Sequence, residues 1–384
     1  MCLMLWDICG EWQTTSVTVT TVSNQRPQKH MENFTNSVPE DYIDEIQTVD
    51  VILTFIGSLF SIIGAILLFF TYFIRWRNKY PIDQPRQLLL FLTFADVFNA
   101  VGYLWGVASF VDSDESRRTN VSACHPVADP SCIGQSFVTT WFSMSSFFWT
   151  TIIAFHLFWT YDDSGKNVWK RNIVYHVSSW VVPFIITLVA KQMKVLGSDL
   201  SVGSGAWCWI SACLSQKERT IWMTVSGKGW EILMYFASFA FYLLIKWRKI
   251  RKRQHQKKVL NANVRYRYTN LETTAHNDGN THEDIRFLLL WLIEVALRMS
   301  GTIRFFIAAI QRHTDKKFLI YKPIDGILLH IQSFGDSAQA FCSFLLFCLL
   351  DKKTRELVKR YCSSRNREDS EIQELLSQSV NIST

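Results

Sequence analysis

Seven long apolar stretches run through this chain of 384 residues and constrain its fold more than any other feature. A bilayer core is about 30 Å thick, so a helix needs roughly 20 predominantly apolar residues to cross it. Each stretch is close to that length or longer, and an odd number of spans places the two chain ends on opposite sides. The predicted spans are residues 51–73, 87–111, 133–161, 173–190, 221–245, 285–310 and 324–350.

A soluble helical protein is the alternative interpretation of this apolar content. It would need seven helices with almost no polar face, and residues 133–161 contain no Asp, Glu, Lys or Arg at all. We therefore predict an all-α membrane protein built as a seven-transmembrane helix bundle over residues 51–350. An extracellular segment, 1–50, precedes the bundle, and a short amphipathic eighth helix with a disordered tail, 351–384, follows it in the cytoplasm.

Lys and Arg are concentrated in every second loop, which predicts the orientation. Short loops rich in these residues stay in the cytoplasm, so we expect a multi-pass plasma-membrane protein with its N-terminus outside. The loop before the seventh span is an exception, because it is also basic. The net charge of +7 then describes a cytoplasmic face near anionic lipid and not a nucleic-acid binder. The basic residues are Arg75, Arg77, Lys79 and Arg86 after the first span, the run 246–258 after the fifth, and Lys352, Lys353 and Arg355 after the seventh.

Three glycosylation sequons offer an independent check on this topology. Asn33 and Asn120 lie on the predicted outer side, where glycosylation occurs, and Asn381 lies inside and should be unmodified. Four cysteines also lie outside: Cys124 and Cys132 before the third span, and Cys208 and Cys213 between spans four and five. Disulfides persist on that side, but four cysteines allow three pairings and the spacing alone does not choose among them.

Ionisable residues inside apolar stretches are expensive in lipid and mark functional positions. Lys228 and Arg304 lie roughly 10 Å below the outer ends of the fifth and sixth spans, and His330 lies at a similar depth in the seventh. Three bases at one depth predict a pocket for an anionic or phosphate-bearing small molecule. Alternatively, Glu231, one turn below Lys228, or Asp325, at the mouth of the seventh span, neutralises them.

Deeper charges predict a polar core. Glu231 and Arg298 fall near mid-membrane on neighbouring spans, so an interhelical salt bridge between them is the simplest arrangement. Glu294 lies four residues before Arg298 on the same helix face and competes as its partner. Such a bridge could be a switch that changes partner or a permanent structural pair.

Asp96 and Asp336 also come near mid-bilayer, on spans two and seven. Two carboxylates in one dry core need a proton or a cation between them, so a sodium site and a hydrogen-bonded acid pair are both open. A third alternative is that each caps a local water network. Gln339, one turn beyond Asp336, could support either the sodium site or the acid pair.

The predicted inner surface holds the candidate G-protein face. The third inner loop begins with a basic run and then becomes polar, without apolar periodicity. The candidate residues are Arg248, Lys249, Arg251 and Lys252. The alternative is that these bases only set the topology and bind anionic membrane lipid.

Several short motifs resemble one receptor family. They include Leu92-Thr93-Phe94-Ala95-Asp96, Ser145-Ser146-Phe147-Phe148-Trp149-Thr150, Trp207-Cys208-Trp209-Ile210, Gly227-Lys228-Gly229-Trp230-Glu231 and Thr302-Ile303-Arg304-Phe305. On these motifs, residues 53–361 resemble the orphan receptors of the G-protein-coupled receptor 157 group. That group is related to the slime-mould cyclic-AMP receptors and, more distantly, to secretin-type receptors.

The resemblance implies a receptor, not an enzyme, that has no cofactor and transmits an unknown extracellular signal to a heterotrimeric G protein by outward movement of the sixth helix. It also implies a Gq-type output, a ciliary location, and a disulfide between Cys132 and Cys208, which leaves Cys124 to pair with Cys213. Two departures matter. The third span lacks the Asp-Arg-Tyr of rhodopsin-type receptors, and the N-terminal segment has only two cysteines, too few for the hormone-binding domain of secretin-type receptors.

A seven-helix transporter or channel for a small solute is the alternative function. Transporters often have broken helices, yet Pro183 is the only proline well inside a predicted span. An intramembrane metalloenzyme would need clustered ligands, and His156, His176 and His330 lie on separate spans without a metal-binding motif.

Overall fold

A computed structural model of the protein describes residues 40–112, 130–160, 168–198, 207–211, 213–262, 270–314, 321–351, 354–356 and 358–360. Side chains are described within these ranges except at 40–47, 256–285 and 311–323. Residues from Asp44 onward belong to one compact unit, and the account below concerns that unit.

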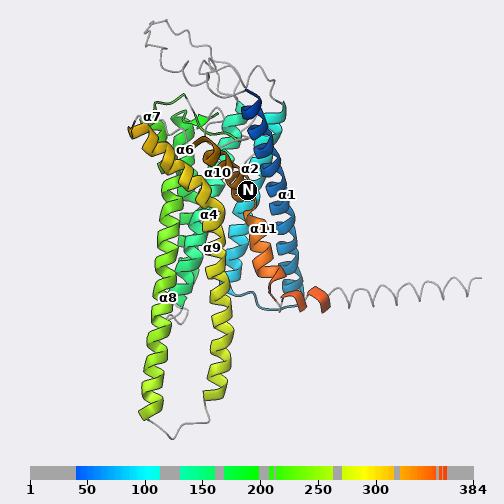
Figure 1. Cartoon of the computed structure of the whole chain (residues 1–384). Coiled ribbons are helices and arrows are strands. Elements are labelled where there is room, and N and C mark those ends of the chain that lie inside the picture. Colours follow the sequence, from blue (N-terminus) through cyan, green and yellow to red (C-terminus); the bar gives the residue numbers. More distant parts are fainter. Residues whose placement is uncertain are drawn as a thin grey trace, which may run out of the picture. The chain divides into compact units, whose positions relative to one another are not determined.

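All seven predicted spans are helical, and the helices run side by side (Figure 1). The first three spans are α1 (Glu40–Arg77), α2 (Gln84–Asp112) and α4 (Pro130–Thr160). The fourth combines α5 (Val168–His176), a π-helical segment (Val177–Val181) and α6 (Val182–Gln192). The fifth combines α7 (Gln216–Met223), a π-helical segment (Thr224–Lys228) and α8 (Gly229–Ala262). The sixth is α9 (Asn270–Thr314), and the seventh combines α10 (Tyr321–Ser337), α11 (Gln339–Phe344) and a π-helical segment (Leu345–Leu349).

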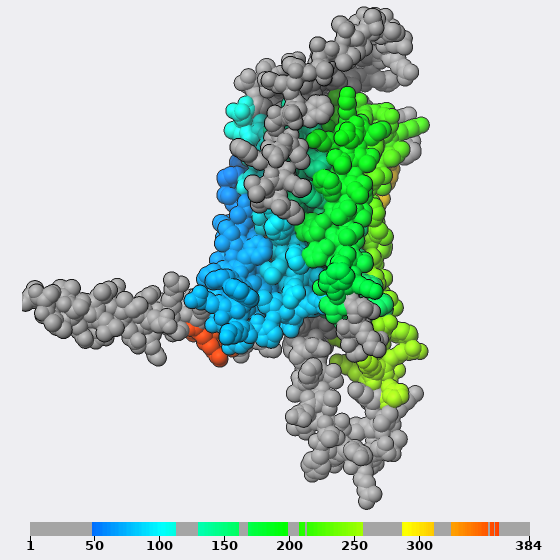
Figure 2. Space-filling view, turned by 180° about the vertical axis from the view of Figure 1, so that it is seen from behind, coloured from blue at the N-terminus to red at the C-terminus, as the bar shows by residue number. Residues whose placement is uncertain are grey.

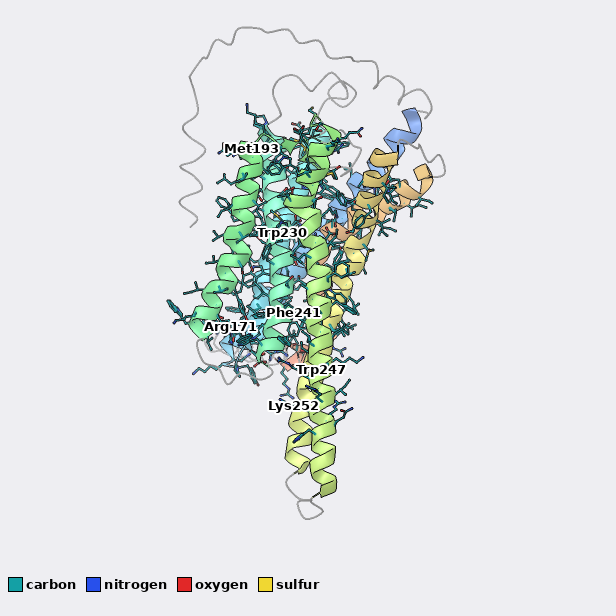
Figure 3. All side chains as sticks on the ribbon, turned by 90° about the vertical axis from the view of Figure 1, so that its left-hand side faces the viewer. Arg171, Met193, Trp230, Phe241, Trp247 and Lys252 are labelled. Atoms are coloured by element: carbon teal, nitrogen blue, oxygen red, sulfur yellow. A yellow bond between two sulfur atoms is a disulfide. The ribbon has the colours of Figure 1, made fainter. Side chains whose placement is uncertain are left out.

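Most helices extend beyond the predicted apolar limits, because apolar content reports only the part of a helix that lies in lipid. The fifth span begins at Gln216 and its helix continues to Ala262, so that α8 and α9 extend past the other helices at one end (Figure 1). Figure 3 labels Trp247 and Lys252 along this part of α8. Residues 354–356 and 358–360 are helical, where the eighth helix is predicted.

Five of the helical segments are long and apolar enough to cross a membrane, and the other two depart from a plain apolar helix in informative ways. The five are Thr48–Arg77, Gln84–Asp112, Pro130–Thr160, Val168–Gln192 and Gln216–His255. The predicted span in α9, residues 285–310, carries four charged residues, at Arg286, Glu294, Arg298 and Arg304. The seventh span is interrupted at Ala338, between α10 and α11. These charges and this interruption set the sixth and seventh spans apart from the other five.

The packing is typical of a helix bundle in lipid, with apolar side chains outside and polar side chains inside. Ile66, Phe236 and Ile327 are 60%, 69% and 60% exposed on helix surfaces, whereas Ser58, Ser145 and Gln135 are fully buried. Figure 2 shows one face of the bundle, where α1 and α2, in blue and cyan, lie beside the green fourth span. A soluble bundle would show the reverse distribution.

The seventh span makes two very close approaches to its neighbours at glycine. A Cβ added at Gly335 of α10 would lie 2.2 Å from the carbonyl oxygen of Leu297 in α9. A Cβ added at Gly57 of α1 would lie 2.1 Å from the Oγ of Ser337. The Gly335 contact is between two backbones and the Gly57 contact is with a side-chain hydroxyl, and a side chain at either position would require a shift. Small residues at such helix contacts are common in membrane bundles.

Candidate ligand pocket and polar core

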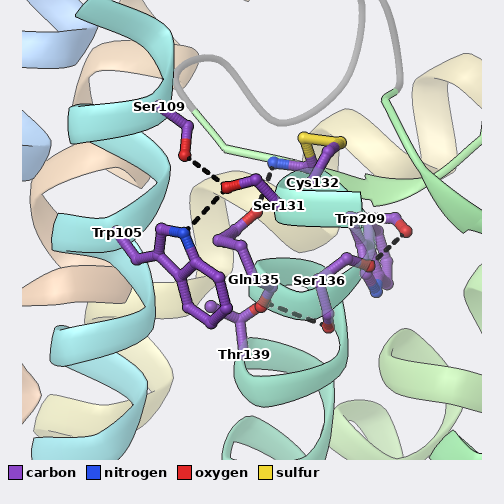
Figure 4. The surroundings of a disulfide bond; sticks show 9 residues. Trp105, Ser109, Ser131, Cys132, Gln135, Ser136, Thr139 and Trp209 are labelled. Carbon is purple, nitrogen blue, oxygen red and sulfur yellow. Dashed lines mark hydrogen bonds between the residues drawn. A yellow bond between two sulfur atoms is a disulfide. The ribbon is translucent and has the colours of Figure 1, made fainter. Parts of the chain in front are cut away.

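A disulfide between Cys132 and Cys208 ties the start of α4 to the loop that precedes the fifth span (Figure 4). The same loop forms a two-residue antiparallel pairing between β1 (Leu196–Gly197) and β2 (Trp209–Ile210). Gln135 accepts a hydrogen bond from the Cys208 backbone N–H at 2.8 Å, and Ser136 donates one to the Trp209 carbonyl at 2.6 Å. The pairing implied by the resemblance is therefore confirmed, and the loop is fixed over the bundle.

The described residues include only one cysteine of the second predicted disulfide. Cys213 is disulfide-bonded, whereas its predicted partner Cys124 lies outside the described residues. The sequons at Asn33, Asn120 and Asn381 also lie outside them, so glycosylation stays a prediction.

A cavity of about 60 Å³ lies among α2, α4, the fixed loop, the fifth span, α9 and α10. Its lining is aromatic and hydroxylic in part, and it contains four charged side chains. The aromatic residues are Tyr103, Phe147, Trp207 and Trp209, and the charged residues are Lys228, Glu231, Arg298 and Asp336. We take this cavity as the candidate ligand pocket, because aromatic walls with a few convergent polar groups are typical of small-molecule sites.

Lys228 and Glu231 form a buried ion pair within the fifth span. The Lys228 Nζ lies 2.9 Å from the Glu231 Oε2, with the two side chains 9% and 3% exposed. Glu231 also accepts hydrogen bonds from Tyr235, at 2.7 Å, and from the Thr302 hydroxyl of α9. The carboxylate is thus neutralised by a cation three residues away, which requires no approach between helices.

Arg298 of α9 connects three elements in the middle of the bundle. Its Nε lies 3.7 Å from the Glu294 Oε2, and its Nη2 donates a hydrogen bond to the Gln339 Oε1 of α11. Its guanidinium lies 4.5 Å from the centroid of the Phe147 ring of α4. The break at Ala338 starts a new helix at Gln339 and directs this amide into the core.

The predicted salt bridge between Glu231 and Arg298 is therefore wrong as a direct contact. Each side chain has a partner on its own helix, and among the described residues no ion pair joins the two. They still interact electrostatically, and Thr302 contacts both, because its hydroxyl also approaches the Arg298 carbonyl at 3.4 Å. Glu294, the competing partner considered from the sequence, is the one that Arg298 contacts.

The three bases predicted to bind an anion together are not brought together. Lys228 lines the cavity, but Arg304, Asp325 and His330 do not. Arg304 makes a bidentate ion pair with Asp325, at 2.8 and 3.2 Å, and donates a hydrogen bond to the Gln332 Oε1 at 2.9 Å. His330 faces α1 instead. Equal depth in the membrane did not mean a shared site, because depth does not fix the direction in which a side chain points.

The partner of His330 in α1 is Asp50. The His330 Nδ1 lies 2.7 Å from the Asp50 Oδ1, and Ser333 donates to the same carboxylate at 3.2 Å. Asp50 is fully buried, and sequence reasoning missed it because it lies at the edge of the apolar stretch. An acidic residue at the start of a span, with a histidine at matching depth in another span, is the signal that could have found it.

Asp96 and Asp336 occupy separate hydrogen-bonding environments. Asp96 accepts a hydrogen bond from Ser146 at 2.7 Å, and the Asp336 Oδ2 accepts one from Gln332 at 3.2 Å. In the part of the chain that the structure describes, no hydrogen bond joins the two acids, so the acid pair predicted as one alternative is not formed. No group of three or more His, Cys, Asp or Glu side chains that could hold a metal ion lies there either.

The end of the bundle where the seventh span finishes contains an ionic cluster that sequence reasoning also missed. Asp351, 1% exposed, lies at the end of the seventh span. Its carboxylate is 3.1 Å from Arg286 of α9 and 3.8 Å from Arg86 of α2. Thr354 donates to it at 2.7 Å. An acidic residue directly before a basic run is the sequence signal that could have identified this cluster.

The predicted G-protein face lies on α8 near this cluster's end of the bundle. Arg248 stacks 3.9 Å above the Phe158 ring of α4 and donates to the Phe158 carbonyl at 3.3 Å. Arg251 lies 4.3 Å above the ring of Trp247. The other two candidate residues, Lys249 and Lys252, lie on the same helix.

Comparison with known proteins supports both the fold and the resemblance. The chain is 28% identical to G-protein coupled receptor 157 of Homo sapiens over 73% of this chain and 75% of that protein. It is 26% identical to Cyclic AMP receptor-like protein C of Dictyostelium discoideum over 38% of each chain. The crystal structure of squid rhodopsin superimposes with a TM-score of 0.58 over 91% of each chain at 12% identity, which confirms the seven-helix fold alone.

A family model adds a relation that the motifs did not indicate. The description of that model is Frizzled/Smoothened family membrane region, and the match covers residues 43–271, more than half of the chain. The match includes the first five spans, with the disulfide-fixed loop and the Lys228–Glu231 pair. This chain therefore belongs to the family that this model describes, the Frizzled/Smoothened family membrane region.

Proposed function

We propose that this chain is a seven-helix receptor that converts an extracellular signal into nucleotide exchange on a heterotrimeric G protein. The observation that carries the proposal is the position of Arg298, which lines the candidate ligand pocket and also contacts Glu294 and Gln339 in the core. A ligand that alters the Arg298 contacts would act directly on α9, the helix that we expect to move. The names of the relatives, a G-protein coupled receptor and a cyclic AMP receptor-like protein, support the same class.

The inner cluster supplies the second half of the proposed mechanism. Arg286 pairs with Asp351 at 3.1 Å, which ties the inner end of α9 to the end of the seventh span. The Tyr242 hydroxyl donates to the Phe287 carbonyl at 2.8 Å, which ties α9 to α8. These contacts hold α9 against the bundle, and their loss would free its inner end to move outward. Two discrete arrangements of one helix are what a receptor switch needs.

Orientation and output complete the proposal. The basic loops support a plasma-membrane protein with its N-terminus outside, and the basic residues of α8 would then face the G protein. A Gq-type output and a ciliary location rest on the resemblance to G-protein-coupled receptor 157. The anionic signal expected from the sequence is not part of this proposal, because Lys228 is paired with Glu231.

The test uses the full-length chain in cells that carry activation sensors for each class of G protein. Arg286→Gln removes the charge that ties α9 to Asp351, so this variant should raise basal activation several-fold at equal surface expression, most strongly with Gq. Arg355→Gln, which removes an exposed charge of the same region, is the matched control and should leave activation unchanged. No activation of any G protein by the wild-type chain or by Arg286→Gln would refute the proposal.

A flux measurement on the purified chain distinguishes the receptor from the alternative, a transporter or channel. Reconstituted vesicles that contain the purified chain and no G protein should show no flux of protons or small solutes above that of empty vesicles. Flux that requires the chain, together with silent G-protein sensors, would favour the alternative.

A further inference from the structure

One carboxylate in the candidate ligand pocket lacks a complete set of partners. Asp336 is 7% exposed and lines the cavity. Its Oδ2 accepts a hydrogen bond from Gln332 at 3.2 Å, and its Oδ1 has no hydrogen-bond partner. A buried polar atom without a partner loses its hydration without compensation. The lining of the pocket therefore includes a carboxylate of which one oxygen, itself buried, has no hydrogen-bond partner.

The cations of the pocket already have other partners. Lys228 pairs with Glu231, and Arg298 pairs with Glu294 and Gln339. Both cations attract Asp336 electrostatically, but neither forms an ion pair with it within the described part of the chain. Four carboxyl groups, those of Asp336, Glu231, Glu294 and Asp96, thus share two cations. An additional positive charge would balance this cluster better than an additional anion.

The walls of the cavity suit the same kind of ligand. Tyr103, Trp207 and Trp209 line it, and the Tyr103 and Trp207 rings meet edge to face at 4.9 Å between centroids. Aromatic faces attract organic ammonium groups through their negative π-surface. The volume of about 60 Å³ has room for about four water-sized groups, so the ligand group that enters must be small.

We propose that this pocket binds the protonated amine of a small organic ligand, with the ammonium N–H donating to the carboxylate of Asp336 and the aromatic walls enclosing its carbon atoms. This is the reverse of the anionic ligand expected from Lys228 and Arg304. The inference rests on the proposed function only in treating the pocket as the place where the signal enters. Binding itself can be measured without a G protein.

The experiment measures the thermal stability of the purified full-length chain in lipid nanodiscs with methylammonium chloride as the probe. Potassium chloride at equal ionic strength controls for salt, and sodium phosphate is the anionic comparison. Methylammonium should raise the melting temperature in a saturable manner, because a ligand that binds only the folded state stabilises it. Phosphate and potassium should not.

Three variants assign the effect to the pocket. Asp336→Asn is isosteric and still accepts from Gln332, so it should fold and should weaken methylammonium binding by about 10–100-fold. Ser226→Leu partly fills the cavity, keeps every charge and should also abolish the shift. Asp112→Asn removes an exposed carboxylate at the end of α2 and should retain the wild-type shift.

The outcomes separate this inference from the proposed function. An equal methylammonium shift in the wild type and in Asp336→Asn, or a shift with phosphate alone, or no shift at all in the wild type, would overturn the ammonium site. A shift that depends on Asp336, together with G-protein sensors that stay silent in every variant, would leave the site standing and refute the receptor proposal.

Discussion

The ion pair between Lys228 and Glu231 can be tested by a double-mutant cycle. Lys228→Gln leaves the Glu231 carboxylate, 2% exposed, without its cation. Removing one partner of a buried pair costs about 3–5 kcal/mol, because the other charge is left uncompensated. The hydroxyls of Tyr235 and Thr302 still donate to this carboxylate, so we expect a loss near the lower end, about 3 kcal/mol.

The double variant Lys228→Gln/Glu231→Gln removes both charges and should recover part of that loss. We expect a coupling energy of about 2 kcal/mol, within the range for residues in direct contact. The sequence-based alternative pairs Glu231 with Arg298, so a second cycle uses Arg298→Gln with the same Glu231→Gln. That cycle should give a coupling of about 0.5 kcal/mol, because the two charges interact without contact.

The assay is the free energy of unfolding in mixed micelles, followed by tryptophan fluorescence, to which 15 Trp residues contribute. Lys217→Gln on the exposed face of α7 is the control for loss of a positive charge and should change the stability by less than about 0.5 kcal/mol. A larger coupling for Glu231 with Arg298 than for Glu231 with Lys228 would refute the pairing described here and restore the interhelical bridge.

Three further predictions test the Cys132–Cys208 disulfide, the helix contacts and the topology. Cys132→Ala and Cys208→Ala should each lower surface expression sharply, with the double variant no worse than either, because both remove one bond; additive losses would contradict this. Gly335→Ala should destabilise the chain by about 1–3 kcal/mol because its Cβ would meet the Leu297 carbonyl at 2.2 Å, whereas Gly197→Ala, whose nearest neighbour lies at 3.5 Å, should be tolerated in the same melting assay. Endoglycosidase should reduce the apparent mass of the chain, and Asn381→Gln should leave that change intact; glycan on that residue would reverse the orientation.

The sequence by itself determined the class of fold. Apolar blocks long enough to cross a bilayer permit only helices there, because lipid offers no partner to a backbone N–H or carbonyl. The resemblance of its motifs to a receptor group supplied the pairing of Cys132 with Cys208, which spacing alone left open. The sequence also identified Glu294, Arg298 and Arg304 of α9, because an ionisable residue in an apolar stretch stands out from its neighbours.

Only the tertiary structure decided which of these charges meet. Counting residues along a helix gives the depth of a side chain, but the rotation of each helix about its axis decides what it faces. The π-helical segment that ends at Lys228 and the interruption at Ala338 alter that rotation. Neither contains a proline from which the irregularity could be predicted. Arg298 therefore contacts Gln339 and Glu294 in place of Glu231, His330 faces Asp50, and the Oδ1 of Asp336 has no hydrogen-bond partner.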